Sequence, residues 1–200
     1  NIKILIKEKN KFKNFIIKDV LTSMGENTAL EWTPDFNLKW SDFQAESNPA
    51  IFEDSHSVIK YRFTWTVNSD KIKGEIVFLI ENIQIFTEFH PLLSWVRLSE
   101  SEASLLNHEQ VKFDLAELVK RENIVSLQDK FHNKHFPTRG QNEDQRKQYA
   151  KEDSGKMINK EVEKLQKLFD EKCLKYHDDT NYGQNLDEQS NYDVLVKQIK

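Results

Sequence analysis

Residues 57–98 alternate between apolar and polar side chains over most of their length, and this pattern constrains the fold more than any other part of the chain. Successive side chains of a β-strand point to opposite faces of the sheet, so alternation predicts strands with one buried face. From residue 58 to residue 67, the face predicted to be buried carries Ile59, Tyr61, Phe63, Trp65 and Val67.

The same stretch predicts a meander of three antiparallel strands. Residues 68–71 and 81–82 are rich in Asn, Asp and charged side chains that favour turns, and they divide the stretch into strands at 58–67, 72–80 and 83–89. His90-Pro91 ends the third strand, because proline has no N–H for the ladder. Residues 92–98 are expected to form a fourth strand or a bend packed on the sheet.

Further strands are predicted nearer the N-terminus. Residues 2–7 alternate isoleucine with polar side chains, and residues 12–24 fit a strand slightly better than a helix. Two short strands are expected around Pro34-Asp35, and residues 44–57 are expected to be a loop.

After residue 98 the apolar spacing changes from two to three or four, which is typical of helices. Ser99 with Glu102 and Asp114 with Glu117 form capping boxes, which predict helices that start near residues 100 and 114. A third short helix is expected at 124–132, ended by the Pro137-Thr138-Arg139-Gly140 sequence. The charged segment 142–177 predicts one long helix with Ser154-Gly155 as a candidate interruption, followed by a polar loop at 178–189.

These patterns predict an α+β fold. An antiparallel β-sheet with a meander at its centre occupies the N-terminal half and packs with α-helices from the C-terminal half. We expect a core domain at 1–140, with the sheet in 1–98 and short helices in 99–136. A helical extension at 141–200 would hold the long helix and a short terminal helix at 190–199.

Composition limits the class of protein. The 200 residues are 31% charged, yet thirteen Phe and four Trp argue against a disordered chain. One cysteine rules out an internal disulfide, and no apolar run is long enough for a membrane helix, so we expect a cytoplasmic protein without membrane contact. The sequence leaves open whether Asn1 is the natural start.

Common catalytic motifs are not found in the sequence. Its five glycines are scattered and form no phosphate-binding loop, no G-x-S-x-G motif occurs, and no second cysteine exists to pair in a zinc site. We therefore expect a non-enzymatic protein–protein interaction module, a subunit or adaptor of a larger assembly, that binds another protein or a second copy of itself.

Two groups of residues are candidates for partner binding. Trp65, Trp95 and Arg97 lie in the predicted sheet, and tryptophan and arginine dominate binding hot spots. The alternative is that the chain's own helices cover them. The second group is a narrow apolar stripe on the long helix, which would fit one groove or one partner helix: Ile158, Val162, Leu165 and Phe169.

A metal-dependent enzyme is the first alternative function. His132 and His135, with Cys173 and His177, could supply four zinc ligands if the two segments met, so zinc is the one cofactor that the sequence suggests. The competing interpretation is that Cys173 continues the apolar stripe and that the histidines of the first pair cap helix carbonyls.

A nucleic-acid-binding protein is the second alternative. Lys9, Lys11 and Lys13 lie beside Phe12 and Phe15, and basic residues next to aromatic rings can hold single-stranded nucleic acid. Such lysines also occur on solvated strand edges, where they prevent aggregation.

Overall fold

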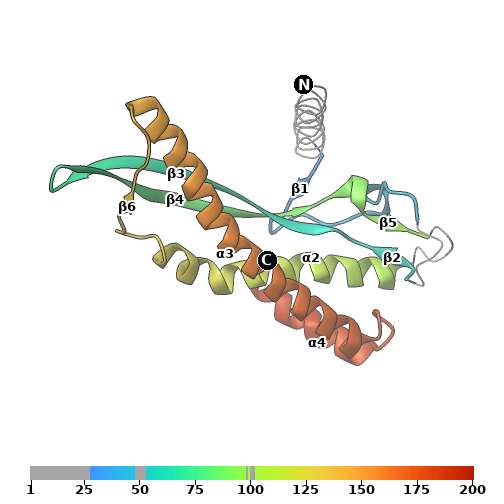
Figure 1. Cartoon of the computed structure of the whole chain (residues 1–200). Coiled ribbons are helices and arrows are strands. Elements are labelled where there is room, and N and C mark those ends of the chain that lie inside the picture. The colour runs from blue at the N-terminus through green and yellow to red at the C-terminus, as the bar shows by residue number, and fades with distance from the viewer. Residues whose placement is uncertain (1–27, 48–52, 98, 100–101) are drawn as a thin grey trace, which may run out of the picture.

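The computed structural model describes residues 28–47, 53–97, 99 and 102–200 of the chain. In this part the antiparallel strands lie mainly in the N-terminal half and three α-helices follow, which confirms the predicted α+β class (Figure 1). The strands expected at 2–7 and 12–24 fall outside the described residues.

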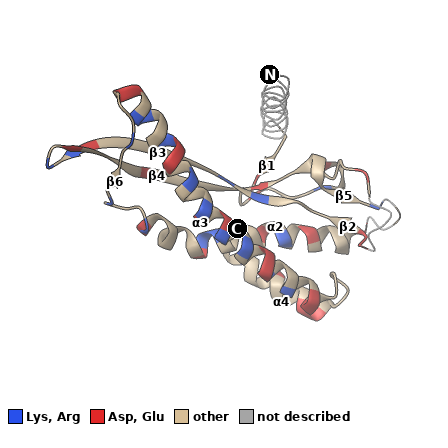
Figure 2. Cartoon of the chain, viewed as in Figure 1, with Lys and Arg blue, Asp and Glu red and all other residues tan. Residues whose placement is uncertain are grey.

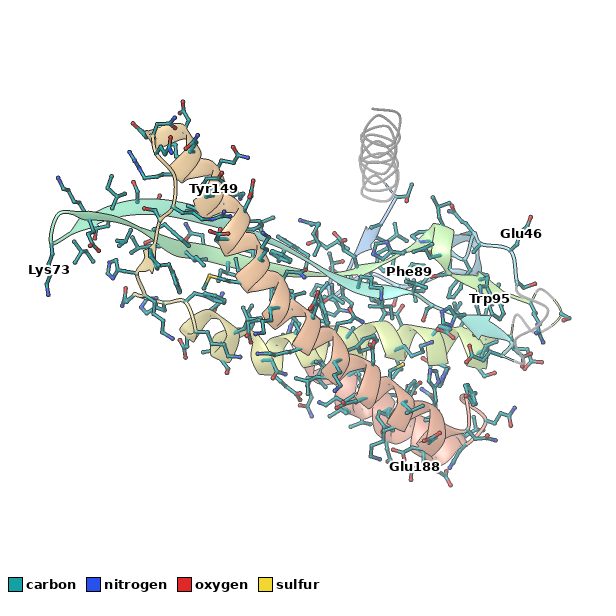
Figure 3. The ribbon with its side chains drawn as sticks, viewed as in Figure 1. Glu46, Lys73, Phe89, Trp95, Tyr149 and Glu188 are labelled. Atoms are coloured by element: carbon teal, nitrogen blue, oxygen red, sulfur yellow. The ribbon has the colours of Figure 1, made fainter. Side chains whose placement is uncertain are left out.

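A long β-hairpin forms the centre of the sheet. Strand β3 (Ile59–Ile72) pairs antiparallel with β4 (Glu75–Phe89), and Lys73 and Gly74 form the turn with φ of 51° and 90°. A two-residue turn with both φ positive matches the right-handed twist of the strands, and glycine adopts this conformation without strain. The turn forms one end of the molecule, where Figure 3 labels Lys73.

The turns expected at 68–71 and 81–82 are wrong. Asn68 and Asp70 stay inside the ladder, opposite Leu79 and Val77. At the second position the strand continues, and Asn82 adopts a φ of 51° beside a shift of the β3–β4 register. Asparagine tolerates this left-handed conformation, so it forms a β-bulge here and the stretch makes two long strands instead of three short ones.

Four short strands complete the described sheets. Strands β1 (Leu30–Glu31) and β6 (Phe136–Pro137) pair with opposite ends of β4, while β2 (Ser55–His56) pairs with β5 (Trp95–Val96) in a separate two-stranded sheet. The second strand expected near Pro34-Asp35 is instead a 3₁₀ turn, η1 (Trp40–Asp42), in which the Lys39 N–H donates to Asp42 Oδ2 at 2.8 Å. The expected bend after residue 90 is the 3₁₀ turn η2 (Pro91–Leu93).

Helix α2 (Ala103–Asp129) is continuous, so the prediction of three short helices is wrong. Asp114 does not cap a helix start, because its carboxylate accepts hydrogen bonds from the Trp32 indole and the Gln110 amide at 2.8 and 2.9 Å. The helix begins after Glu102, whose side chain makes no capping hydrogen bond. The start expected near residue 100 therefore lies three residues too early, and the pattern at Asp114 and Glu117 marks tertiary contacts rather than a helix start.

Helix α3 (Glu143–Thr180) confirms the long charged helix, and it passes Ser154-Gly155 without interruption. The Trp65 ring packs on this point: its Nε1 donates to Ser154 Oγ at 2.8 Å, and a Cβ on Gly155 would lie 3.1 Å from the ring. Glycine here allows the close approach of a strand side chain. The last helix, α4 (Leu186–Val196), begins four residues earlier than expected and continues into the 3₁₀ turn η4 (Lys197–Ile199).

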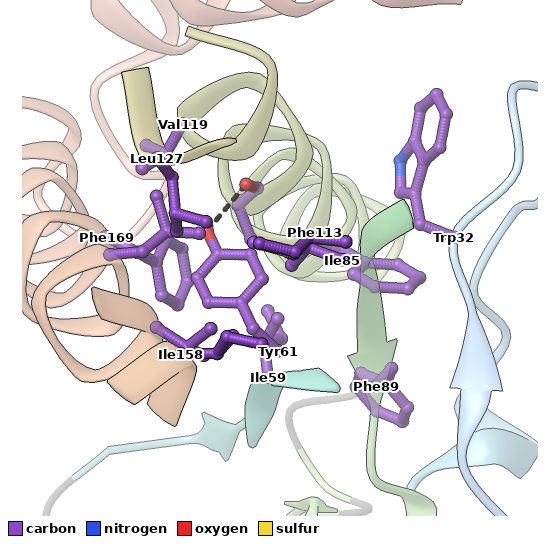
Figure 4. Packing of buried hydrophobic residues seen from close by; sticks show 14 of the residues in the cluster. Trp32, Ile59, Tyr61, Ile85, Phe89, Phe113, Val119, Leu127, Ile158 and Phe169 are labelled. Atoms are coloured by element: carbon purple, nitrogen blue, oxygen red, sulfur yellow. Dashed lines mark hydrogen bonds between the residues drawn. The ribbon is translucent and has the colours of Figure 1, made fainter. Parts of the chain in front are cut away.

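The core lies between one face of the hairpin and helices α2 and α3. Ile59, Ile85 and Phe89 from the sheet meet Phe113 and Val119 from α2 and the apolar stripe of α3 (Figure 4). The Tyr61 hydroxyl is also buried here, and it donates to the backbone carbonyl of Ala116 at 2.7 Å. Charged residues of both signs are distributed along α3 and α4 (Figure 2).

Helix α2 also has a buried polar side, and this side holds the other segments in place. Its Gln110 Oε1 accepts from the backbone N–H of Leu38 at 2.7 Å, and Glu117 Oε2 accepts from the Thr87 hydroxyl at 2.8 Å. Asp114 pairs in addition with Lys200 Nζ at 2.9 Å. The chain is therefore fixed to α2 by hydrogen bonds from both before and after the helix.

We expect Asp114→Ala to lower the free energy of unfolding by about 3–5 kcal/mol, because it leaves Lys200 and the Trp32 N–H without their buried acceptor. A residue that only capped a helix would cost about 1 kcal/mol. Urea unfolding measures the difference, and Asp178→Ala, at an exposed position of α3, is the control. A loss near 1 kcal/mol in the Asp114 variant would contradict its role as a tertiary anchor.

Candidate functional site

The apolar stripe of α3 lies inside the protein. Ile158, Val162, Leu165 and Phe169 are all buried in the core against the sheet and α2. Their partner is the chain's own hairpin, so this stripe is not a surface on which another protein could dock in this conformation.

The three candidate residues of the sheet have different environments. Trp95 is buried and stacks on His56 with ring centroids 6.1 Å apart. Trp65 is half-buried under α3, where Lys151 Nζ lies 3.6 Å from the centre of its ring. Arg97 lies 3.8 Å from Asp54 and about a third of its side chain is exposed. The alternative interpretation, in which helices cover the tryptophans, therefore describes Trp65, while Trp95 packs within the β2–β5 region.

The four candidate zinc ligands do not converge. Cys173 and His177 do meet, with Sγ and Nε2 3.4 Å apart, but their third neighbour is His108, near the start of α2. His132 and His135 lie beyond the other end of α2, roughly 30 Å away at 1.5 Å per helical residue. Within the described residues, no group of three or more His, Cys, Asp or Glu side chains could hold a metal ion.

The lysines that suggested nucleic-acid binding, Lys9, Lys11 and Lys13, lie outside the described residues. That interpretation stays a prediction.

The side chains that do converge lie around the first turns of α2. Glu109 is buried and accepts hydrogen bonds from the hydroxyls of Ser55 and Ser57 at 2.6 and 2.5 Å. Lys112, also buried, places its Nζ 2.9 Å from Glu109 Oε2. Strand β2 and the residue after it thus supply donors to the carboxylate from one side, and the next turn of the same helix supplies the counter-ion.

The charge states of this pair follow from their contacts. Burial alone would raise the pKa of Glu109, but Lys112 and the two serine hydroxyls outweigh it and hold the pKa at about 2. Likewise, burial would lower the pKa of Lys112, but the attraction of Glu109 outweighs it and the pKa is raised. The pair is therefore a buried carboxylate and a buried ammonium at neutral pH.

A chain of hydrogen bonds runs beside this ion pair from Gln189 to Cys173. The Gln189 amide N–H donates to Asp193, so its Oε1 faces His108 Nδ1, 3.3 Å away, and must accept from it. His108 Nε2 then accepts from His177 Nδ1 at 3.0 Å, which leaves His177 Nε2 to accept from the Cys173 thiol. This assigns one tautomer to each histidine and a protonated state to the cysteine.

Burial favours the neutral state of all three groups in this chain. It lowers the pKa of His108 to about 4 and that of His177 to about 3, and it raises the pKa of the Cys173 thiol to about 11. The direction of the hydrogen bonds and the pKa values therefore agree: neutral imidazoles and a thiol.

An open cavity of about 580 Å³ lies above these groups, and we call it the α2 cavity. It is lined by residues 53–55, by side chains between Glu102 and Glu109, and by residues 182–184 and Leu186. His108 and Glu109 belong to its lining although each is only 1% exposed, so the buried polar groups lie directly beneath this opening.

The backbone at residues 181–183 is unusual. Asn181, Tyr182 and Gly183 all have positive φ, of 46°, 54° and 83°. Tyrosine rarely adopts this conformation, and strained residues of this kind are concentrated at functional sites. The turn places the Tyr182 ring on His177, with centroids 4.9 Å apart, and Gly183 against His108, where a Cβ would lie 3.1 Å from the His108 Cβ.

Sequence reasoning singled out Cys173 and His177 but missed the α2 residues of this site, although a signal for them exists. The residues His108-Glu109-Gln110-Val111-Lys112 have the spacing of the His-Glu-x-x-His motif, in which two histidines on one helix face bind zinc and the glutamate acts as a base. Lysine stands here at the position of the second histidine. A protonated amine has no lone pair for a metal, so the arrangement builds an ion pair instead.

Comparisons with protein-family models, with curated proteins and with solved structures find no match for this chain. In the part of the chain that is described, no helix has both the length and the apolar character needed to span a membrane.

We expect Lys112→Met to destabilise the protein by about 3–5 kcal/mol, because it leaves the Glu109 carboxylate buried without its counter-ion. The double variant Lys112→Met/Glu109→Gln should be more stable than the sum of the two single losses predicts, since it removes both charges. Lys175→Met, which breaks an exposed pair with Asp179, should cost less than about 1 kcal/mol. The measurement is a double-mutant cycle of unfolding free energies from urea denaturation. If the losses of the two single variants simply add in the double variant, Glu109 and Lys112 are not coupled.

His108, which is buried, and His177, which is half-buried, should make the protein less stable in mild acid. Their pKa is lower in the folded protein than in the unfolded chain, where it is about 6.5, so below that pH the unfolded state binds protons that the folded state excludes. Stability should fall as pH is lowered from about 6.5 towards 4, by at most about 1.4 kcal/mol per pH unit for each histidine. Urea midpoints between pH 7.5 and 4.5 measure this.

The control for this pH dependence is a pair of variants. His177→Gln removes one titrating imidazole and should reduce the slope by about half, whereas His132→Gln, at the far end of α2, should leave it unchanged. Equal slopes in both variants would mean that other groups cause the loss of stability.

Proposed function

We propose that the chain is a non-catalytic protein-binding protein, a subunit or adaptor of a larger assembly, and that its docking site is the α2 cavity. The observation that carries this proposal is that the ionisable groups beneath the cavity already bond to one another. Glu109 accepts from Ser55, Ser57 and Lys112, and His108 bonds to Gln189 and His177.

These groups are poorly suited to catalysis in the states described above. A carboxylate with a pKa of about 2 is a weak base at neutral pH, and a thiol with a pKa of about 11 is present almost entirely in its unreactive form. The Glu109–Lys112 pair and its serine donors instead give the cavity a fixed polar floor. A rigid floor under an open cavity suits recognition of a partner.

The walls of the cavity support docking of a protein. Leu186 is 68% exposed and Tyr182 is 47% exposed, and both line the opening. Exposed leucine and tyrosine beside a preformed polar floor resemble the anchor region of a binding site, where a partner gains affinity by covering apolar surface.

The test compares variants at two positions of similar exposure, for which the proposal predicts opposite results. Leu186→Glu should abolish or strongly weaken the stoichiometric complex that native mass spectrometry detects after gentle purification. Val125→Glu, at a site on α2 that is 63% exposed and outside the cavity lining, should leave the complex intact. A photo-crosslinking residue at position 186 should attach to the partner, and the same residue at position 125 should not.

Two results would overturn the proposal. One is a complex that survives Leu186→Glu. The other is enzymatic turnover that is lost in Glu109→Gln, because this would make the buried carboxylate a catalytic group.

A further inference from the structure

We propose that the α2 cavity recognises an arginine side chain of the partner protein. This inference rests on the proposed function and names the chemistry by which the partner is recognised. It follows from the charge of the cavity, from the aromatic ring at its opening, and from the way in which this chain holds its own arginines.

The lining of the cavity is acidic. Glu53, Asp54, Glu102 and Glu109 contribute to it, and no lysine or arginine does so among the described residues. Lys112 compensates Glu109 from beneath, and Arg97 lies 3.8 Å from Asp54. Two further carboxylates, Glu53 and Glu102, line the cavity. Glu53 lies 3.4 Å from the His56 imidazole. The cavity therefore favours a cation.

Tyr182 adds an aromatic surface to this acidic rim. One face of its ring stacks on His177, and the side chain is nevertheless 47% exposed at the cavity. The left-handed backbone of residues 181–183 holds the ring in this position. A planar cation can stack on such a ring while it pairs with a neighbouring carboxylate.

The chain holds three of its own arginines in this way. Arg62 lies 4.1 Å from the centre of the Phe86 ring and pairs with Glu88 and Glu31. Arg139 lies 4.0 Å from the Tyr149 ring centre and pairs with Asp153. Arg121 lies 5.1 Å from the Trp32 ring centre and pairs with Glu117.

The α2 cavity offers the same two components, an aromatic ring and carboxylates, in a concave site whose described lining residues include no arginine. A guanidinium from outside would complete the arrangement. Arginine fits better than lysine, because its planar group can stack on Tyr182 and donate to two acceptors at once, whereas an ammonium is a compact, strongly hydrated charge.

The experiment titrates the full chain, labelled with ¹⁵N, with the peptide acetyl-Gly-Arg-Gly-amide, up to about 10 mM because a single side chain gives only weak affinity. Amide shifts of residues 53–55, 102–109 and 182–186 report binding. The matched peptides replace arginine by citrulline, which has the same shape without the charge, or by lysine. We expect citrulline to bind at least about tenfold more weakly than arginine, and lysine to bind more weakly as well.

Variants locate the contact. Tyr182→Leu should weaken arginine binding about two- to fivefold, while Tyr182→Phe, which keeps the ring, should bind like the original protein. Glu102→Gln should also weaken binding about two- to fivefold, and Glu171→Gln, an exposed acid of α3 outside the cavity, should not.

Three outcomes would overturn the inference: no shift at the cavity residues, equal shifts with citrulline, or binding that is unaffected by both cavity variants. Tighter binding of the lysine peptide would assign the cavity to an ammonium instead. If the complex still depends on Leu186 in any of these cases, the docking site stands and only the arginine is wrong. If it does not depend on Leu186, the proposed function has failed on its own test.

Discussion

The ten residues of α2 from His108 to Glu117 are all buried, and six of them are polar or charged. Each of these side chains finds a partner on another segment or on the next turn of the helix, as Glu109 does with Ser55 and Asp114 does with Trp32. Buried ionic contacts add little net stability when compared with apolar packing, but a wrong pairing leaves a charge without a partner and costs several kcal/mol. We infer that this stretch of α2 fixes how the hairpin, the loops before it and the C-terminal helices fit together.

This constraint explains which parts of the fold could be predicted from the sequence. Alternation in β3 and β4 and the stripe on α3 are local patterns, and both gave the correct element type. The position of the hairpin turn was not predicted correctly. Gly74 forms the turn, whereas Asn82, a residue type equally common in turns, forms a β-bulge inside the strand. The continuity of α2 could not be read from its pattern, because Asp114 and Glu117 look like a capping box unless one knows that Trp32 and Thr87 lie against them.

The candidate site was missed for a related reason. Sequence reasoning paired Cys173 with His177 as candidate zinc ligands and offered the apolar stripe as the alternative for Cys173. Neither pattern points to His108, which is 69 residues away from His177. Only the order of His108, Glu109 and Lys112 was visible in the sequence, as a helix-borne motif with lysine in place of its second histidine. The contribution of Tyr182 depends on a left-handed turn, which sequence patterns do not predict for tyrosine.

The lysine gives this site its particular character. In a histidine-based site, the charge that a buried glutamate faces would come from a metal ion and could be lost with it. Here the charge belongs to the Lys112 side chain, so the floor of the cavity is complete as soon as the chain folds. The charges of this floor are fixed, because changing the protonation of either partner would leave a buried charge unpaired. A site built in this way has a permanent charge pattern and holds its carboxylate and its amine in fixed charge states, which supports the binding function proposed above.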